Sequence, residues 1–168
     1  MNENIKLIAE RIAGLRDIME ITPDEMAETL NISLEAVSYT HLEATNFLAE
    51  RRGIMDDCLF CKIIRGEIPS DKVYEDEMVL AFNDIDKKAP VHILVIPKKH
   101  VGSLLELGDE DAALTAHIMG VIQRIAKETG VDKSGFRVVV NTGDDGGQTV
   151  HHLHFHILGG RSLEWPPG

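Results

Sequence analysis

The feature that most constrains this chain is an alternation of histidine and apolar residues near its C-terminal end. His152, His154 and His156 are each separated by one apolar residue. Because side chains alternate between the two faces of a β-strand, the pattern predicts a strand with all three imidazoles on one face. The apolar residues would be buried on the other face: Leu153, Phe155 and Ile157. An ordinary imidazole has a pKa of about 6.5, so both of its proton states are accessible at neutral pH.

A glycine-rich segment, Gly146-Gly147-Gln148-Thr149, directly precedes the histidines. Glycine lets the backbone approach a ligand closely, and backbone amides beside a threonine hydroxyl form a cradle for an anion. An anion cradle next to a histidine nucleophile is what phosphoryl or nucleotidyl transfer requires. The alternative is a flexible hairpin loop beside an ordinary histidine-rich strand.

Composition limits the classes of partner. The formal net charge of the 168 residues is −11, which argues against general binding of nucleic-acid backbones. No apolar run is long enough to span a bilayer, and the first residues lack the pattern of a signal peptide. We therefore expect a cytoplasmic protein that has no membrane partner. In that compartment Cys58 and Cys61 would not form a structural disulfide, which leaves a redox pair, a metal site or two buried thiols.

The chain divides into two parts by its pattern, residues 1–55 and 56–168. In the first part, residues 4–20 have the periodicity of an amphipathic helix, and Thr22 and Glu25 form a capping box for the next one. Residues 5–37 resemble the helix-turn-helix of small bacterial repressors. The helix from Ser33 to His41 has no Arg or Lys for phosphates or bases, so we favour a packing or dimerisation arm over DNA binding. A fusion without an evolved role is the third alternative.

The second part has the pattern of an α+β domain. A sheet of about five antiparallel strands is expected, with one long and one shorter helix. The expected helices cover 60–65, ended by Gly66, and 109–129, followed by Gly130. The expected strands cover 73–75, 79–82, 92–96, a buried segment at 136–140, and the histidine strand. His41, His117 and His151 are assigned to packing, surface or solvent.

Residues 56–168 resemble the histidine-triad (HIT) family, in particular its Hint-like branch of nucleoside phosphoramidases. The motifs that carry the resemblance are the three histidines followed by Gly159-Gly160-Arg161, the segment from His92 to His100, Phe82-Asn83-Asp84-Ile85, and Trp165-Pro166-Pro167-Gly168. The resemblance implies hydrolysis of purine nucleoside phosphoramidates or aminoacyl-adenylates, with release of AMP or GMP. It also implies a homodimer whose sheets join edge to edge and whose long helices pack together.

The resemblance assigns a role to each residue of the site. His154 would attack the α-phosphorus and form a covalent nucleotidyl-histidine, and His156 would hydrogen-bond the phosphate or the leaving-group oxygen. His152 and His92 would lie behind His154 and set its tautomer. The residues implied in nucleotide binding are Asn141, Gly147, Gln148 and Thr149 at the phosphate, Asp84 at the ribose, Phe60, Ile63, Phe82, Ile85 and Leu94 around the purine, and Trp165 reaching toward the partner's site. The alternative for the five apolar residues around the purine is ordinary hydrophobic core.

The same resemblance implies a structural zinc held by Cys58, Cys61, His100 and His152, with no metal required for catalysis. A Cys2His2 set suits tetrahedral zinc and leaves no open position. Reduced, unmetallated cysteines and a redox pair stay open as alternatives.

Two further functions also stay open. One is a zinc hydrolase that uses the three histidines as ligands, and the other is a nucleotide-binding regulator with a helical DNA- or partner-binding extension.

Overall fold

The computed structural model describes Thr22, Glu25, Glu28 and residues 55–165. The chain divides into two compact units, Met1–Met55 and Asp56–Gly168. In the first unit the Thr22 amide donates to Glu25 Oε2 (2.8 Å) and the Glu25 amide donates to Thr22 Oγ1 (3.3 Å). This reciprocal pair is the predicted capping box. The helix expected over 4–20 and the segment from Ser33 to His41 lie outside the described residues.

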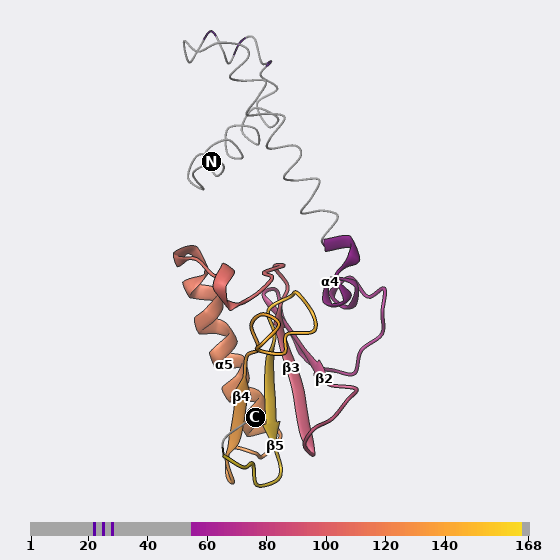
Figure 1. The fold of residues 1–168 in the computed structure, drawn as a ribbon, viewed down its shortest axis with the longest axis vertical. Helices are drawn as coiled ribbons and strands as arrows, with labels where there is room; N and C mark the ends of the chain where they lie inside the picture. Colours follow the sequence, from indigo (N-terminus) through magenta and orange to yellow (C-terminus); the bar gives the residue numbers. More distant parts are fainter. Residues whose placement is uncertain (1–21, 23–24, 26–27, 29–54, 166–168) are drawn as a thin grey trace. The chain divides into compact units, whose positions relative to one another are not determined.

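The second unit is built on one antiparallel sheet (Figure 1). Its strands are β1 (Lys72–Glu75), β2 (Val79–Asn83), β3 (Val91–Pro97), β4 (Phe136–Val139) and β5 (Phe155–Gly159). They lie in the order β1-β2-β3-β5-β4, and every neighbouring pair is antiparallel. The predicted α+β class with five strands is therefore confirmed. Since β3 and β5 are central neighbours, the two stretches of chain that carry most of the histidines lie side by side.

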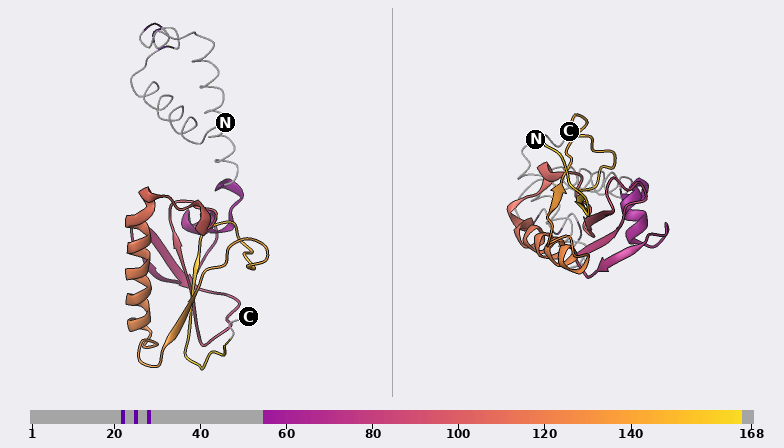
Figure 2. Two further views of the ribbon diagram at one scale, coloured as in Figure 1. Left: turned by 60° about the vertical axis from the view of Figure 1, so that its left-hand side comes forward. Right: turned by 90° about the horizontal axis from the view of Figure 1, so that it is seen from below.

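One face of the sheet is covered by the long helix α5 (Ala112–Glu128), as Figures 1 and 2 show. Its apolar side packs on alternate residues of the central strands, including Ile93, Val95 and Phe155. The helix is entered through two 3-10 turns, η1 (Leu104–Glu106) and η2 (Asp109–Asp111), so the α-helix proper begins after the predicted residue 109. It ends before Gly130, whose φ of 75° allows the chain to reverse, as predicted.

The other face of the sheet is covered by the short helix α4 (Leu59–Ile64), which ends before Gly66 as predicted. Phe60, Cys61 and Ile63 of α4 pack against β2 and β3 and form a second apolar cluster. This face also carries the side chains of His92, Leu94 and His156. The histidines and α4 therefore share one side of the sheet.

Two details differ from the expectations for the strands. β5 begins at Phe155, so His152 and His154 precede the strand instead of lying on it. The His152 amide closes a turn on the Val150 carbonyl (2.8 Å), which delays the ladder, although Leu153, Phe155 and Ile157 are buried as predicted. The segment expected to be a buried strand at 136–140 forms the edge strand β4, where Phe136 and Val138 are about two-fifths exposed (39% and 38%). Among the described residues no helix is long and apolar enough to cross a membrane.

Candidate active site and metal centre

The pairing of β3 with β5 brings His92 and His156 together. Leu94 lies opposite His156 in the ladder, and His92 lies on the same face of β3 two residues before Leu94. The imidazoles meet with His92 Nε2 and His156 Nδ1 2.9 Å apart. The His154 ring follows, with its centroid 5.0 Å from that of His156. His92 therefore lies beside His156, whereas the sequence analysis placed it behind His154.

Backbone groups determine which nitrogen of His154 carries a proton. His154 Nδ1 lies 2.6 Å from the His152 carbonyl oxygen. A carbonyl can only accept, so Nδ1 carries the proton and donates it, and Nε2 keeps a free lone pair in the neutral ring. His154 is only 4% exposed, and the Phe60 ring packs edge-on against it at a centroid distance of 5.3 Å. His154 is thus a fixed imidazole with one nucleophilic nitrogen.

The same reasoning fixes His92 and His156. The Lys88 amide donates to His92 Nδ1 (3.2 Å), so the proton of the neutral His92 ring is on Nε2. His156 Nδ1 faces that N–H and must be the acceptor, which leaves the proton of His156 on Nε2. This Nε2 is buried and has no hydrogen-bond partner within the described part of the chain. It is a donor without an acceptor.

His156 is held in its neutral form. Burial, together with the neighbouring His154 and His92, lowers the pKa of His156 to about 4, while the Asp84 carboxylate acts in the opposite direction. The site therefore places His154 Nε2, which is bare in the neutral ring, beside an N–H on His156. A nucleophile next to a hydrogen-bond donor suits attack on an anionic phosphoryl or acyl centre.

Asp84 lies at the end of β2 next to the histidine pair. Its Oδ1 accepts from the Asp86 amide (2.8 Å), and its Oδ2 lies 3.2 Å from His92 Nε2. Asp84, His92 and His156 have the composition of a three-ligand metal site. A metal there would have to bind His92 through the nitrogen that carries its proton, because Nδ1 is occupied by the Lys88 amide. The tautomers therefore favour a hydrogen-bonded relay over a metal at this position.

The glycine-rich loop is held by Gln148. Its Oε1 accepts from the Gly143 amide (3.1 Å), and its Nε2 donates to the carbonyls of Gly102 (2.6 Å) and Val150 (3.0 Å). The side chain is 6% exposed, so its polar atoms are used within the loop and not directed to a ligand. Gly147 has a φ of 73°, a conformation that favours glycine. Asn141 contacts the Gly147 carbonyl (3.5 Å), and Thr149 is exposed.

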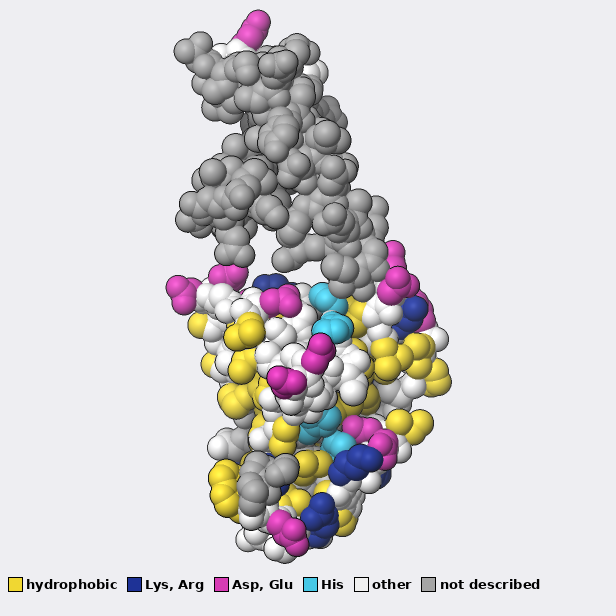
Figure 3. All heavy atoms as spheres, in the orientation of Figure 1, with side chains coloured by type: hydrophobic (Ala, Val, Ile, Leu, Met, Phe, Trp, Pro, Cys, Tyr) yellow, Lys and Arg dark blue, Asp and Glu magenta, His cyan; other side chains and the backbone are white. Residues whose placement is uncertain are grey.

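The five apolar residues assigned to the purine fall into two groups. Four are buried between α4 and the sheet, with exposures of 5–7%: Phe60, Ile63, Phe82 and Leu94. They belong to the apolar cluster that also contains Leu80 and Ile96, in line with the alternative of ordinary core. Ile85 is fully exposed (102%), as is most of Trp165 (83%). Figure 3 shows histidine side chains at the surface in this view, with acidic side chains beside them.

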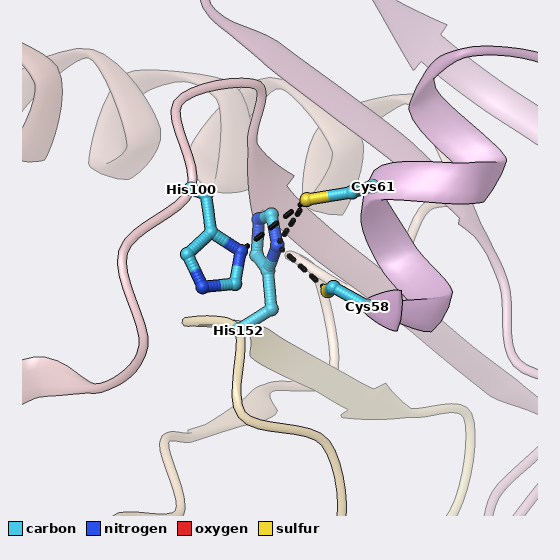
Figure 4. Close-up of side chains that lie close together, drawn as sticks. All are labelled: Cys58, Cys61, His100 and His152. Carbon is cyan, nitrogen blue, oxygen red and sulfur yellow. Dashed lines mark hydrogen bonds between the residues drawn. The ribbon is translucent and has the colours of Figure 1, made fainter. Parts of the chain in front are cut away.

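A second constellation contains Cys58, Cys61, His100 and His152 (Figure 4). The cysteines flank the first turn of α4, His100 follows β3, and His152 precedes β5. His152 Nδ1 lies 3.5 Å from Cys58 Sγ and 3.6 Å from Cys61 Sγ, and His100 Nδ1 lies 3.3 Å from Cys61 Sγ. All four ligand atoms are within 4.8 Å of one another. The structure thus brings together the four predicted ligands.

The donor set fits a tetrahedral cation. Bonds of about 2.3 Å to sulfur and about 2.0 Å to nitrogen would place the S and N ligand atoms about 3.5 Å apart, close to the spacings found here. His152 Nε2 donates to the Pro97 carbonyl (2.9 Å), so its Nδ1 lone pair faces the two sulfurs. Without a cation, burial and the neighbouring Cys58 raise the pKa of Cys61 to about 12, which keeps the thiol protonated. The cluster can therefore bind a metal.

Sequence reasoning missed a polar cluster on the opposite side of the sheet. Asp76 Oδ2 accepts from Tyr74 Oη (2.7 Å) and lies 2.6 Å from His117 Nε2 on α5. Burial alone would raise the pKa of Asp76, but hydrogen bonds from Tyr74, the Val79 amide and His117 hold it well below its usual range. His117 had been assigned to packing or solvent. No motif connects residues 76 and 117, so only the packing of α5 reveals this contact.

Comparisons with known proteins agree with this geometry. A family model described as the HIT domain matches residues 65–163. An uncharacterised HIT-like protein of Synechococcus elongatus is 56% identical over 113 residues, which cover 67% of this chain and 98% of that protein. The crystal structure of a HIT family hydrolase from Legionella pneumophila matches with a TM-score of 0.66 and 47% identity, over 67% of this chain and all of that one (100%). A histidine triad protein from Clostridium difficile matches with a TM-score of 0.63 and 59% identity, over 64% and 94% of the two chains.

Proposed function

The chain belongs to the HIT family, and from that premise we propose that it hydrolyses purine nucleoside phosphoramidates and related aminoacyl-adenylates. The observation that carries the proposal is the hydrogen bond from His154 Nδ1 to the His152 carbonyl, which leaves Nε2 as the nucleophile. Hydrolase activity also agrees with the HIT family hydrolase among the structural relatives. We expect the protein to act in the cytoplasm.

The proposed reaction has two steps. His154 Nε2 attacks the α-phosphorus, so an N–P bond to the protein forms and the P–N or P–O bond to the leaving group breaks. Water then attacks the nucleotidyl-histidine, and the N–P bond is replaced by an O–P bond. Over both steps one water is consumed, giving AMP or GMP and a protonated leaving group. His156 Nε2–H donates a hydrogen bond to the phosphate or leaving-group oxygen, which suits a buried donor without a partner.

The test is AMP release from adenosine 5′-phosphoramidate in the presence of EDTA. We expect turnover by the wild type and none by His154→Ala. His151→Ala is the matched control, because His151 is an exposed histidine in the same segment and should leave turnover unchanged. Acid quenching during turnover should trap a nucleotide on the wild-type protein and none on His154→Ala. Tight AMP binding without turnover would refute the hydrolase and favour the nucleotide-binding regulator.

We further propose that the cysteine–histidine cluster holds a structural zinc. Cys58, Cys61, His100 and His152 would be the ligands, and the filled coordination sphere would tie α4 to the loop before β5. When bound, the metal would supply rigidity and no chemistry at the phosphate, because all four positions belong to the protein. His152 would keep its Nε2–H on Pro97, so its carbonyl would stay aligned with His154. Metal analysis of the purified protein would test this with one zinc expected per chain.

We also propose that two chains associate through β4 and α5. Phe136 and Val138 of the edge strand and Met119 of α5 are apolar and exposed (38–44%) in the single chain. An edge strand with unpaired backbone groups and apolar side chains is suited to pairing with a second copy. Light scattering after size exclusion should give twice the mass of one chain, and Val138→Lys should shift it to the monomer.

A further inference from the structure

We propose that Arg161, which lies outside the histidine cluster, is a positioning residue that sets the tautomers of His92 and His156. Its guanidinium donates twice to the Lys88 carbonyl, from Nη2 at 3.0 Å and from Nε at 3.3 Å. The same residue, Lys88, uses its amide to donate to His92 Nδ1. The effect on the reaction rests on the proposed function, whereas the effect on the histidine protons does not.

The contacts form a continuous path into the site. Arg161 holds the carbonyl of Lys88, and the amide of Lys88 keeps His92 Nδ1 unprotonated. His92 then presents Nε2–H to His156 Nδ1 at 2.9 Å, and His156 presents Nε2–H to the site. The Asp84 carboxylate, 3.2 Å from His92 Nε2, favours a proton on the same nitrogen. Each link fixes the donor and acceptor of the next.

Loss of the Lys88 amide would reverse this chain. His92 could then carry its proton on Nδ1 and present a lone pair at Nε2. His156 would respond by placing its proton on Nδ1, because the 2.9 Å contact requires one donor and one acceptor. Its Nε2 would become an acceptor facing an anionic phosphate. The site would keep its shape and its nucleophile but lose the donor on His156.

The local packing brings Arg161 against this segment. Gly159 pairs with Val91, and a Cβ on Gly160 would lie 3.0 Å from Pro90 Cβ, so the chain after β5 runs close to the segment that leads into β3. A third donor of Arg161, Nη1, binds the Ser162 carbonyl (2.9 Å) and fixes the guanidinium plane. A lysine has one compact ammonium and cannot reproduce this planar arrangement.

The test combines tautomer measurement with kinetics. In 15N NMR of histidine-labelled protein, with His92 assigned by His92→Gln, wild-type His92 should be the Nε2–H tautomer. Arg161→Met should give a mixture of tautomers and lower kcat about three- to tenfold, the factor carried by one net hydrogen bond. KM should change less, since no substrate contact is removed. Arg161→Lys should fall between the two, and Arg124→Met, an exposed arginine on α5, should change neither quantity.

The outcomes separate this inference from the proposed function. If Arg161→Met keeps the wild-type tautomer of His92 and the wild-type kcat, Arg161 has no positioning role. If the tautomer changes while the wild type shows no phosphoramidase activity, the positioning role stands and the proposed function is refuted. A fall in kcat with an unchanged tautomer would refute the relay through Lys88.

Discussion

Gln148→Leu separates the two roles considered for this residue. The family resemblance assigns Gln148 to the phosphate, whereas the structure uses its side chain within the loop. Leucine has about the same side-chain volume as glutamine, but it cannot form the three hydrogen bonds to Gly143, Gly102 and Val150. Backbone groups that lose a partner in a buried place destabilise a fold by about 1–3 kcal/mol each. Since part of this loop is exposed, we expect about 2 kcal/mol in total for the three groups.

The free energy of unfolding is measured by urea denaturation, monitored by far-UV circular dichroism. Nucleotide binding is measured by calorimetry. A loss of about 2 kcal/mol corresponds to a fall of roughly 8 °C in the melting temperature of a unit that spans residues 56–168. The structural role predicts this loss together with weaker AMP binding, because the loop no longer holds its shape. Thr149→Val changes an exposed neighbour and should leave stability within about 0.5 kcal/mol. Unchanged stability of Gln148→Leu with weakened AMP binding would refute the structural role and support direct contact with the nucleotide.

Three further predictions concern the core, the pH dependence and the metal cluster. Leu153→Ala should lower the free energy of unfolding by about 2–5 kcal/mol, because Leu153 is buried (1% exposed). Leu105 is 85% exposed, so Leu105→Ala should lower it by less than about 0.5 kcal/mol. The pKa of His156 is lowered by burial to about 4, so the unfolded state binds its proton first and stability should fall as pH drops from about 6.5 toward 4. His156→Gln should flatten this fall, and an unchanged slope would contradict the assignment. Cys61→Ser should lose the proposed zinc and have a lower melting temperature, whereas one zinc per chain in both proteins would exclude Cys61 as a ligand.

The periodicity of the sequence was sufficient to predict the helices and strands, but it was insufficient to predict the contacts between them. The alternation at 152–157 correctly predicted that Leu153, Phe155 and Ile157 are buried, because a one-residue shift would turn all three away from the cluster that α5 covers. It did not show that a turn at Val150–His152 delays the strand. The edge position of β4 was also hidden, since an apolar segment looks the same in the centre and at the edge of a sheet.

The site shows the same limit. The four potential metal ligands, which the structure brings together, were named as a group from the family resemblance, whereas residue types alone pointed only to the Cys58–Cys61 pair. The partner of His92 could not be read in this way, since it depends on the register of β3 against β5. Gln148 and Arg161 were equally hidden, because their partners are backbone carbonyls and amides that carry no residue identity.

The atoms that fix the histidine protons have a consequence for engineering. His152 O, Pro97 O and the Lys88 amide are main-chain groups. Among single replacements, only proline at position 88 would remove one of them. The positions of the protons on the imidazole rings therefore depend on the backbone conformation as much as on the histidines themselves. Copying His152, His154 and His156 onto another scaffold would transfer the imidazoles without their tautomers. A transplant would have to include the loop at 88, the end of β3 and the turn before β5 as one unit.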